Sequence, residues 1–434
     1  MAYLDHAATS PMRPEVLAAY TSALGVVGNP SSIHAAGQAA RALLEDGREA
    51  IAASLGADAV EVVLTGGGTE AVNLGIKGLY WARNAGGRAG GAGGAGGAGG
   101  AAMPRIVVPM AEHHATIDAV EWLARHEGAV IDWIEVDALG RIRLDALDAA
   151  LATGAGEVAL VTALWANNEV GTIQPVRAIV DAAARFGVPV HLDAIAAFGS
   201  VPIDFHASGA AALSVSAHKI GGPVGIGALL VRRGVQVEPL LHGGNQQAQR
   251  SGTQDAAGAA AFGVAARGAT GLRSAGQVDG SQPVASQPVA SQFVASQFEA
   301  VHARMAGLRD RLVGGILSTI DGAVLRGDPD SAGRLPGNAH FTFDGCEGDS
   351  LLYLLDAAGY SVSAGSACQA GVPDVSHVLL AMGLPESAAR GALRFTLGPE
   401  TTEAEIDALL TALPGVVEQA RAAGLAARTP SLGR

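Results

Sequence analysis

A single lysine in the middle of the chain stands among residues that could bind a phosphorylated cofactor. It is Lys219, in the run Ser214-Val215-Ser216-Ala217-His218-Lys219, and the only other lysine of the sequence is Lys77. Arginine can replace lysine as a charge, but it does not readily form a Schiff base. Ser216 and His218 alternate on one side of the lysine and could hold a phosphate. The run therefore indicates a pyridoxal phosphate Schiff base on Lys219, and a solvated surface lysine is the alternative.

A carboxylate and a glycine turn lie where strands are expected to end. Asp193 closes the apolar run 188–193, and ligands of open α/β sheets bind at the carboxyl ends of the strands. It could pair with a pyridinium nitrogen, and a helix-capping aspartate is the alternative. Gly66-Gly67-Gly68-Thr69 follows the apolar residues 60–64, so its N–H groups could cradle a phosphate. A purely structural turn is equally expected, because no Walker lysine and no dinucleotide-binding spacing are present.

The chain has two cysteines with different surroundings. Cys368 lies among small residues in Ser363-Ala364-Gly365-Ser366-Ala367-Cys368-Gln369-Ala370-Gly371, where a loop would expose the thiol and could move. Most lone cysteines are buried and inert, and this is our interpretation of Cys346. Two cysteines cannot form a disulfide framework, so a reducing cytoplasm is the expected compartment.

Composition narrows the class of protein. The 434 residues include 28 basic and 41 acidic side chains, for a net charge of −13, which argues against a nucleic-acid partner. Hydrophobic residues make up 49%, enough for a sizeable core. No apolar run reaches the about 18 residues of a membrane span, and the first residues do not resemble a secretory signal. We expect a cytoplasmic protein without a membrane partner, and we predict no metal site.

Strand-like and helix-like pieces alternate through the middle of the chain. We expect strands at 105–108, 130–136, 158–165, 188–193, 213–216 and 226–231, and helices between them, such as 177–186. This alternation predicts an α/β domain with a mostly parallel sheet. The last two strands follow each other closely, which predicts a hairpin-like turn between them.

Two low-complexity segments do not fit a packed domain. Residues 86–102 are nearly all glycine and alanine, whose small side chains cannot offset the entropy of ordering, so we expect a flexible surface insertion. Residues 281–300 repeat a five-residue unit of the type Ser-Gln-Pro-Val-Ala four times, too short for a solenoid repeat. We interpret this segment as a repeat expansion in a loop or at the start of a helix, ahead of the helical pattern 301–316.

The order and spacing of the motifs resemble those of the cysteine desulfurases, pyridoxal phosphate enzymes of the class V aminotransferase group. The resemblance extends over nearly the whole chain outside the two low-complexity segments. The residues from Cys368 to a helix at Val378 resemble the longer cysteine loop of the NifS/IscS-like branch. The matching segments are 3–9, 28–34, 112–115, 167–171, 216–219, 242–244, 250–253, 366–368 and 393–398.

The resemblance implies the PLP-dependent transferase fold type I, with a mainly parallel seven-stranded sheet in a large domain and a smaller α/β C-terminal domain. It would place the large domain at 15–265, including the insertion 86–102. The small domain would combine 1–14 with 266–434, including the insertion 281–300. A homodimer with its sites at the subunit interface is implied as well.

By the same resemblance, three residues would carry the reaction. Lys219 would hold the cofactor and move protons, and His113 would stack on its ring and act as an acid or base. Cys368 would attack the sulfur of bound L-cysteine, so that L-alanine leaves and a persulfide remains. A mobile loop would hand that sulfur to an acceptor protein, for iron–sulfur cluster assembly or for thio-cofactor or tRNA synthesis.

The resemblance also implies the binding residues. Arg394 would clamp the substrate carboxylate, which arginine does bidentately, with help from Asn29. The cofactor-binding residues would be Gly68, Thr69, His113, Asn168, Asp193, Ser216, His218 and Lys219, with Thr253 reaching in from the second subunit.

The sequence departs from the family at two places. Ala196 stands where a glutamine usually donates a hydrogen bond to the phenolic oxygen of the cofactor, so we expect a shifted cofactor pKa and slower turnover. Residues 245–249 also depart, at a loop expected near the dimer edge. A selenocysteine lyase, another class V pyridoxal enzyme, and a catalytically weak sulfur-relay scaffold are the alternatives. Retention of Lys219, Asp193 and Cys368 weighs against the scaffold.

Overall fold

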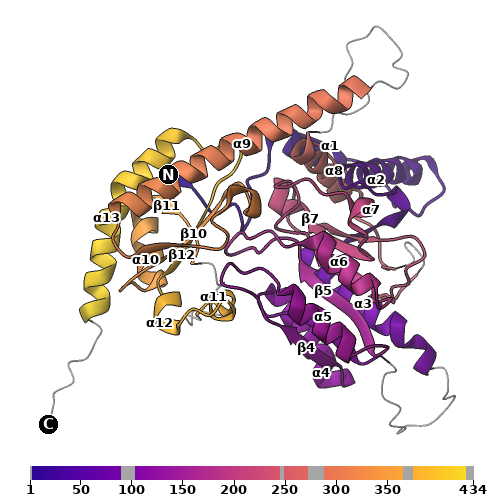
Figure 1. Ribbon diagram of the computed structural model, residues 1–434. Helices are drawn as coiled ribbons and strands as arrows, with labels where there is room; N and C mark the ends of the chain where they lie inside the picture. The colour runs from indigo at the N-terminus through magenta and orange to yellow at the C-terminus, as the bar shows by residue number, and fades with distance from the viewer. Residues whose placement is uncertain (1, 89–102, 245–248, 272–287, 365–374, 427–434) are drawn as a thin grey trace.

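The computed structural model describes residues 2–88, 103–244, 249–271, 288–364 and 375–426. The chain forms a large and a small lobe, each built around its own sheet, and helix α9 (Pro288–Thr319) runs along both (Figure 1). Cys368 lies outside the described residues, as do 89–102, 245–248 and 281–287.

The large lobe is built on a seven-stranded sheet in the order β2-β8-β7-β6-β5-β3-β4. Neighbouring strands are parallel, except that β8 runs antiparallel to both β2 and β7. The mainly parallel sheet and the hairpin-like turn are therefore confirmed. The strands are β2 (Val62–Thr65), β3 (Arg105–Pro109), β4 (Val130–Ile134), β5 (Val158–Leu164), β6 (Val190–Asp193), β7 (Ala212–Ser216) and β8 (Gly227–Val231).

Helices cover both faces of this sheet, because successive side chains of a strand point to opposite faces. On β2, Val63 packs in the core with α3 and α4, whereas Val62 and Leu64 pack in the core with α2, α5, α6 and α8. The helices of the lobe are α1 (Pro14–Leu24), α2 (Ala35–Ser54), η1 (Ala59–Glu61), α3 (Gly68–Arg88), α4 (His114–Glu127), α5 (Leu144–Thr153), α6 (Val176–Ala184), α7 (Phe205–Ser208), η2 (Ala217–Ile220) and α8 (Ala256–Thr270).

The small lobe has a three-stranded antiparallel sheet in the order β12-β10-β9. Its apolar face carries Phe341, Phe343 and Phe395, which pack against the long helices, and Leu4 of the N-terminal segment is buried in the same core. The elements are β1 (Ala2–Tyr3), β9 (Ala323–Arg326), η3 (Ser331–Gly333), β10 (Asn338–Phe343), α10 (Gly348–Ala357), β11 (Tyr360–Ser361), α11 (His377–Ala381), α12 (Glu386–Ala389), β12 (Ala392–Thr396) and α13 (Glu403–Ala426).

The ends of both low-complexity segments differ from the sequence-based expectation. Helix α3 continues through Arg88, so residues 86–88 of the expected flexible insertion are helical. An established helix adds residues at little cost, which lets it extend into glycines. Helix α9 begins at Pro288, inside the repeat, so the helix-start interpretation holds for its last part.

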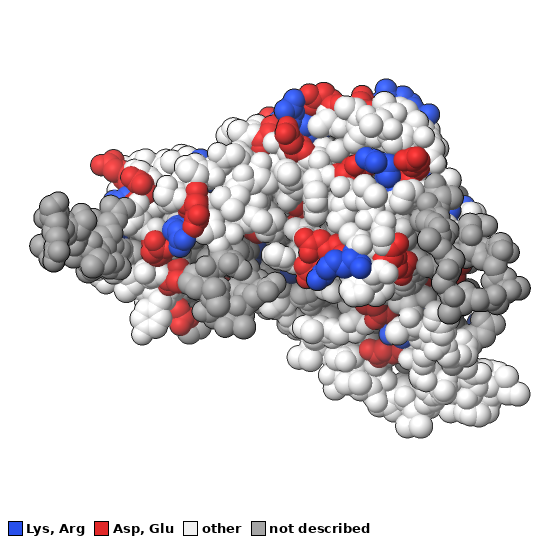
Figure 2. Space-filling model, turned by 90° about the horizontal axis from the view of Figure 1, so that it is seen from below, with Lys and Arg blue, Asp and Glu red and all other residues white. Residues whose placement is uncertain are grey.

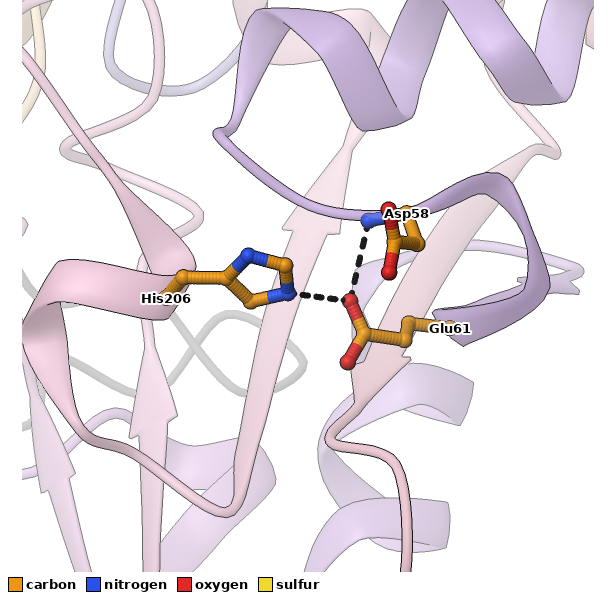
Figure 3. A group of neighbouring side chains, drawn as sticks. All are labelled: Asp58, Glu61 and His206. Atoms are coloured by element: carbon orange, nitrogen blue, oxygen red, sulfur yellow. Dashed lines mark hydrogen bonds and ion pairs between the residues drawn. The ribbon is translucent and has the colours of Figure 1, made fainter.

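A carboxylate at the edge of the large sheet ties η1 to α7. The buried side chain of Glu61 accepts hydrogen bonds from the N–H groups of Asp58 (2.9 Å) and Arg233 (3.1 Å). Nε2 of His206 lies 2.6 Å from Oε2 of Glu61, the same oxygen that accepts from Asp58 (Figure 3). Because its partners come from three separate segments, Glu61 acts as a structural tie.

Charged side chains are sparse and mixed on the surface. The face in Figure 2 shows acidic and basic groups next to one another, with no continuous basic field. Within the described ranges, none of the helices combines the length and the apolar character that a bilayer crossing requires.

Candidate active site

Three of the predicted cofactor residues meet at one edge of the large sheet. Asp193 ends β6 and Ser216 ends the neighbouring strand β7, while Gly68 begins α3 just beyond β2. A Cβ added at Gly68 would lie 3.2 Å from Cβ of Ser216 and 2.5 Å from Cδ1 of Ile195. The start of α3 therefore faces Ser216 across a space that admits only glycine at that position. The buried Oγ of Ser216 has no hydrogen-bond partner among the described residues.

Asp193 is a buried carboxylate beside this space. Its Oδ1 accepts a hydrogen bond from the N–H of Ile195 at 2.9 Å. Burial raises the pKa of Asp193 to about 6, against the opposing effects of that hydrogen bond and of the charge on Lys219. A cationic group opposite Asp193 would lower this pKa, since an opposite charge favours the ionised carboxylate.

Lys219 lies in η2, directly after β7, and the N-terminal segment holds it. Its Nζ donates to the carbonyl oxygens of Ala7 (2.6 Å) and Ala8 (2.9 Å), and its own carbonyl accepts from Oγ of Ser10 (2.9 Å). Burial lowers the pKa of Lys219 to about 8, and the charge of Arg394 adds to the effect. The lysine is therefore closer to its neutral, nucleophilic form than a surface lysine.

His113 is the N-cap residue of α4. Its Nδ1 accepts a hydrogen bond from the N–H of Ala115 at 3.0 Å, which assigns the proton of the neutral ring to Nε2. Although His113 is an exposed residue, nearby protein atoms partly desolvate its ring and lower its pKa to about 4. The charge on Lys219 is the second cause of that shift. The neutral ring is thus the resident form.

Arg394 comes from the small lobe, in the middle of β12. Its Nη1 donates to the carbonyl of Asn168 at 2.8 Å, and its Nη2 donates to Oδ1 of Asp5 at 2.9 Å. The buried Nε has no partner among the described residues. Arg394 therefore joins the N-terminal segment to the loop after β5, and it keeps one donor available.

The segment that contains Cys368 is attached to this site at both ends. At its start, the N–H of Arg394 donates to the carbonyl of Ser363 at 2.6 Å. At its end, His377 Nε2 lies 2.7 Å from the carbonyl oxygen of Glu112, and the His377 ring packs edge-on against His114 at 4.8 Å. Residues 365–374, with Cys368 itself, lie outside the described residues.

The remaining predicted residues stand nearer the rim. Thr69 is exposed in the first turn of α3, and His218 directs Nδ1 to Oγ1 of Thr9 at 3.3 Å. Thr253 is exposed. Asn29 is exposed in the loop after α1, where its Oδ1 accepts from the N–H of Ser31 at 2.9 Å. Within the described part of the chain, the structure gives neither Asn29 nor Thr253 a contact with the central residues.

A cavity of about 560 Å³ adjoins the site. Lys219, Asn168 and Ala196 form its inner end, and it extends between the N-terminal segment and α9. His113, Asp193 and Ser216 do not line it, so the cavity does not include the space between Gly68 and Ser216. A side chain longer than alanine at position 196 has room to enter it.

Two acidic residues near the site were not identified from the sequence. Asp5 contacts Arg394, and Oε1 of the buried Glu112 accepts from the N–H of Leu164 at 2.9 Å, which ties α4 to the end of β5. Burial raises the pKa of Glu112 well above its usual value, and the charge of Asp193 adds to the effect. Asp5 lies in the motif segment 3–9 and Glu112 in the motif segment 112–115, so their membership of these motifs could have identified them.

Comparisons with known proteins match nearly the whole chain. The profile of the Aminotransferase class-V family matches residues 2–409. An IscS-like cysteine desulfurase of Mycobacterium tuberculosis is 48% identical over 98% of this chain and 99% of its own. A solved NifS-like protein has a TM-score of 0.79 at 27% identity, covering 96% of this chain and 99% of that one. A structure described as SspA in complex with cysteine has a TM-score of 0.70 at 27% identity, covering 93% and 100%.

Proposed function

The chain belongs to the class V aminotransferase family, and from that premise we propose that it is a cysteine desulfurase, taking sulfur from L-cysteine and releasing L-alanine. One observation carries the proposal at the level of the site. The charges of the buried Asp193 carboxylate and of the Arg394 guanidinium both act on Lys219, whose pKa is lowered to about 8. A reactive amine, an acid for a pyridinium and a clamp for a carboxylate are what an amino-acid enzyme of this family needs.

The residues fit pyridoxal phosphate. Ser216 offers a buried hydroxyl that has no hydrogen-bond partner in the described part of the chain, next to the N-terminus of α3, where helix N–H groups attract a phosphate. Asp193 would face the pyridinium nitrogen, and that positive charge would offset the cost of burying the carboxylate. Lys219 would attach the cofactor, and His113, Asn168, Thr69 and His218 would complete its surroundings. When bound, pyridoxal phosphate supplies an electron sink for negative charge on the amino acid.

The chain's own groups would bind the substrate and move its protons. Arg394 would hold the carboxylate of L-cysteine, using the Nε that has no partner among the described residues. Lys219, with a pKa of about 8, can take and return a proton near neutral pH. His113, neutral with its proton on Nε2, would donate a hydrogen bond from that nitrogen to a bound group.

Cys368 would receive the sulfur. Its thiolate would form a sulfur–sulfur bond with the substrate while the carbon–sulfur bond breaks, leaving L-alanine and a persulfide on Cys368. The attachment of its segment to Ser363 and His377, both next to site residues, supports this role. We further propose a sulfur-acceptor protein as partner, a homodimer in which Thr253 serves the second site, and a cytoplasmic place of action.

The proposed function is tested by adding L-cysteine to the purified, cofactor-loaded protein with dithiothreitol, which reduces the persulfide and frees sulfide, and quantifying L-alanine and sulfide. The expected result is equal amounts of both, abolished by C368S but with the visible cofactor band intact. Cys346→Ser is the matched control, because Cys346 is buried in the small-lobe core and should leave the rate unchanged. A coloured protein that releases no L-alanine from L-cysteine would contradict the proposal.

A further inference from the structure

The Asp5 carboxylate already binds the side of the Arg394 guanidinium that a substrate carboxylate would use. A guanidinium binds a carboxylate bidentately through its Nε and Nη2. In this structure Oδ1 of Asp5 occupies Nη2 at 2.9 Å, while the neighbouring Nε has no partner among the described residues. The end-on edge is also taken, since Nη1 donates to the carbonyl of Asn168. A second carboxylate therefore cannot engage Arg394 bidentately without displacing one of these two groups.

The backbone of Asp5 is fixed, so only its side chain can move. Asp5 forms a parallel β-bridge with Thr396, which lies two residues after Arg394 on β12. Its carbonyl oxygen accepts from the N–H of Ala8 at 3.0 Å and from the hydroxyl of Tyr3 at 3.2 Å. The Asp5 side chain is 21% exposed, against 6% for Arg394. Rotation of the Asp5 carboxylate toward water is therefore the simplest way to free Nη2.

We propose that Asp5 is a resident stand-in for the substrate carboxylate, which occupies Nη2 of Arg394 until the carboxylate of an amino acid displaces it. The inference rests on the proposed role of Arg394 in the desulfurase and adds a residue that sets substrate affinity. Exchange follows from charge, because two carboxylates on adjacent guanidinium nitrogens would repel each other. The buried guanidinium is never left without a counter-ion, and binding of the amino acid must offset the loss of the Asp5 contact.

Substitution of Asp5 should have the opposite effect to substitution of a residue that binds the substrate directly. Removal of the Asp5 carboxylate should make the amino acid bind more tightly, because Nη2 no longer has to be vacated. The expected gain is about three- to tenfold, in line with a partly exposed ion pair. Only ligands that have a carboxylate should gain, since a ligand without that group does not compete with Asp5 for Arg394.

The test is calorimetric titration of the cofactor-loaded protein with L-alanine and, separately, with L-alaninamide, which lacks the carboxylate. D5N should lower the dissociation constant of L-alanine about three- to tenfold and leave that of L-alaninamide within about twofold. Glu15→Gln is the matched control: it removes the same charge from an exposed residue that pairs with Arg13, and it should change neither constant. D5S provides a second variant with the same expectation.

Two outcomes would overturn the inference. Weaker binding of L-alanine by D5N and D5S would mean that Asp5 holds Arg394 in place for the substrate, and unchanged binding would mean that the contact is incidental. These titrations measure binding without turnover. A wild-type protein that makes no L-alanine from L-cysteine would therefore contradict the proposed function and not the role of Asp5.

Discussion

The Nζ of Lys219 lies 2.6 Å from the carbonyl oxygen of Ala7, so the N-terminal segment holds the amine that would attach the cofactor. The same segment holds Arg394 through Asp5. Residues 5–8 of the N-terminal segment therefore contact both the predicted cofactor lysine and the predicted substrate-binding arginine.

The lowered pKa of Lys219 predicts how cofactor loading depends on pH. Burial and the charge of Arg394 lower that pKa from 10.5 to about 8, so about one amine in ten is neutral near pH 7. The rate of pyridoxal phosphate attachment to the apoprotein should rise with pH and level off above about pH 8. Stopped-flow absorbance measures that rate, and a rise continuing toward pH 10.5 would show an ordinary lysine.

Lys77 provides the matched control for that experiment, because the chain has no third lysine. Lys77 lies in α3, and its Nζ is 4.3 Å from the centre of the Trp122 ring of α4. Borohydride reduction followed by peptide mass mapping should place the cofactor on Lys219 and not on Lys77. K77R should load normally and K219R should not load.

The buried carboxyl group of Glu112 should make the stability of the folded protein depend on pH. Burial raises its pKa in the folded state well above the usual 4.5, so the folded protein keeps a proton that the unfolded chain loses. The wild type should therefore lose stability as the pH rises above about 4.5, by about 1.4 kcal/mol for each pH unit until the folded-state pKa is reached. E112Q does not titrate, so its stability relative to wild type should increase over that interval.

Urea unfolding at a series of pH values measures this difference for E112Q. E112A is the informative control, because it also does not titrate but removes the acceptor of the Leu164 N–H, so it should be less stable than E112Q by about 1–3 kcal/mol at every pH. A constant difference between E112Q and wild type across the pH series would show that Glu112 is ionised in the folded protein.

Ala196 predicts a measurable change in the cofactor environment. Ala196 lines the cavity beside Asn168 and Lys219, so a glutamine has room there. Its amide would donate to the phenolic oxygen of the bound cofactor, and the pH midpoint of the visible absorption change should fall by about one unit, with faster turnover. S200Q, elsewhere on the cavity wall, is the control and should leave the midpoint unchanged. An unchanged midpoint in A196Q would refute the expectation.

His377 predicts an effect on sulfur transfer without an effect on cofactor binding. It fixes the end of the Cys368 segment to the carbonyl of Glu112 at 2.7 Å. H377A should slow L-alanine formation about tenfold, because a less restrained thiol reaches the substrate sulfur less often. The cofactor spectrum should not change. H126A is the control, because it removes an exposed histidine of α4 that does not contact His377. Equal rates of L-alanine formation in wild type and H377A would rule out the anchoring role.

The sequence allowed the edge of the site to be predicted, because parallel strands bring their carboxyl ends together. Asp193 and Ser216 could be assigned to that edge from the apolar runs that precede them, and the structure places them on adjacent strands. The mainly parallel sheet followed from the same alternation. The family resemblance added His113 and Arg394, which no local pattern identifies.

Other features depend on contacts that no local pattern contains. Asp5 and Arg394 are 389 residues apart, and only the pairing of the N-terminal segment with β12 brings them together. Glu112 owes its raised pKa mainly to burial, which exists only in the folded chain. The extension of α3 through Arg88 contradicted a prediction based on glycine content, since a long helix can continue where a helix could not begin.

Glu61 predicts the stability of the far edge of the large sheet at acidic pH. Burial alone would raise its pKa, but hydrogen bonds from Asp58, His206 and Arg233 lower it on balance below 4.5. The folded state therefore favours the carboxylate, and the stability that this gives is present above about pH 4.5 and is lost as the pH falls through the folded-state pKa.

E61Q should be less stable than wild type by about 1–3 kcal/mol near neutral pH, and the difference should shrink in acid. Urea unfolding at both pH values measures it, with E418Q on the exposed side of α13 as the control. A difference that persists unchanged in acid would show that packing, and not the charge of Glu61, holds η1 to α7.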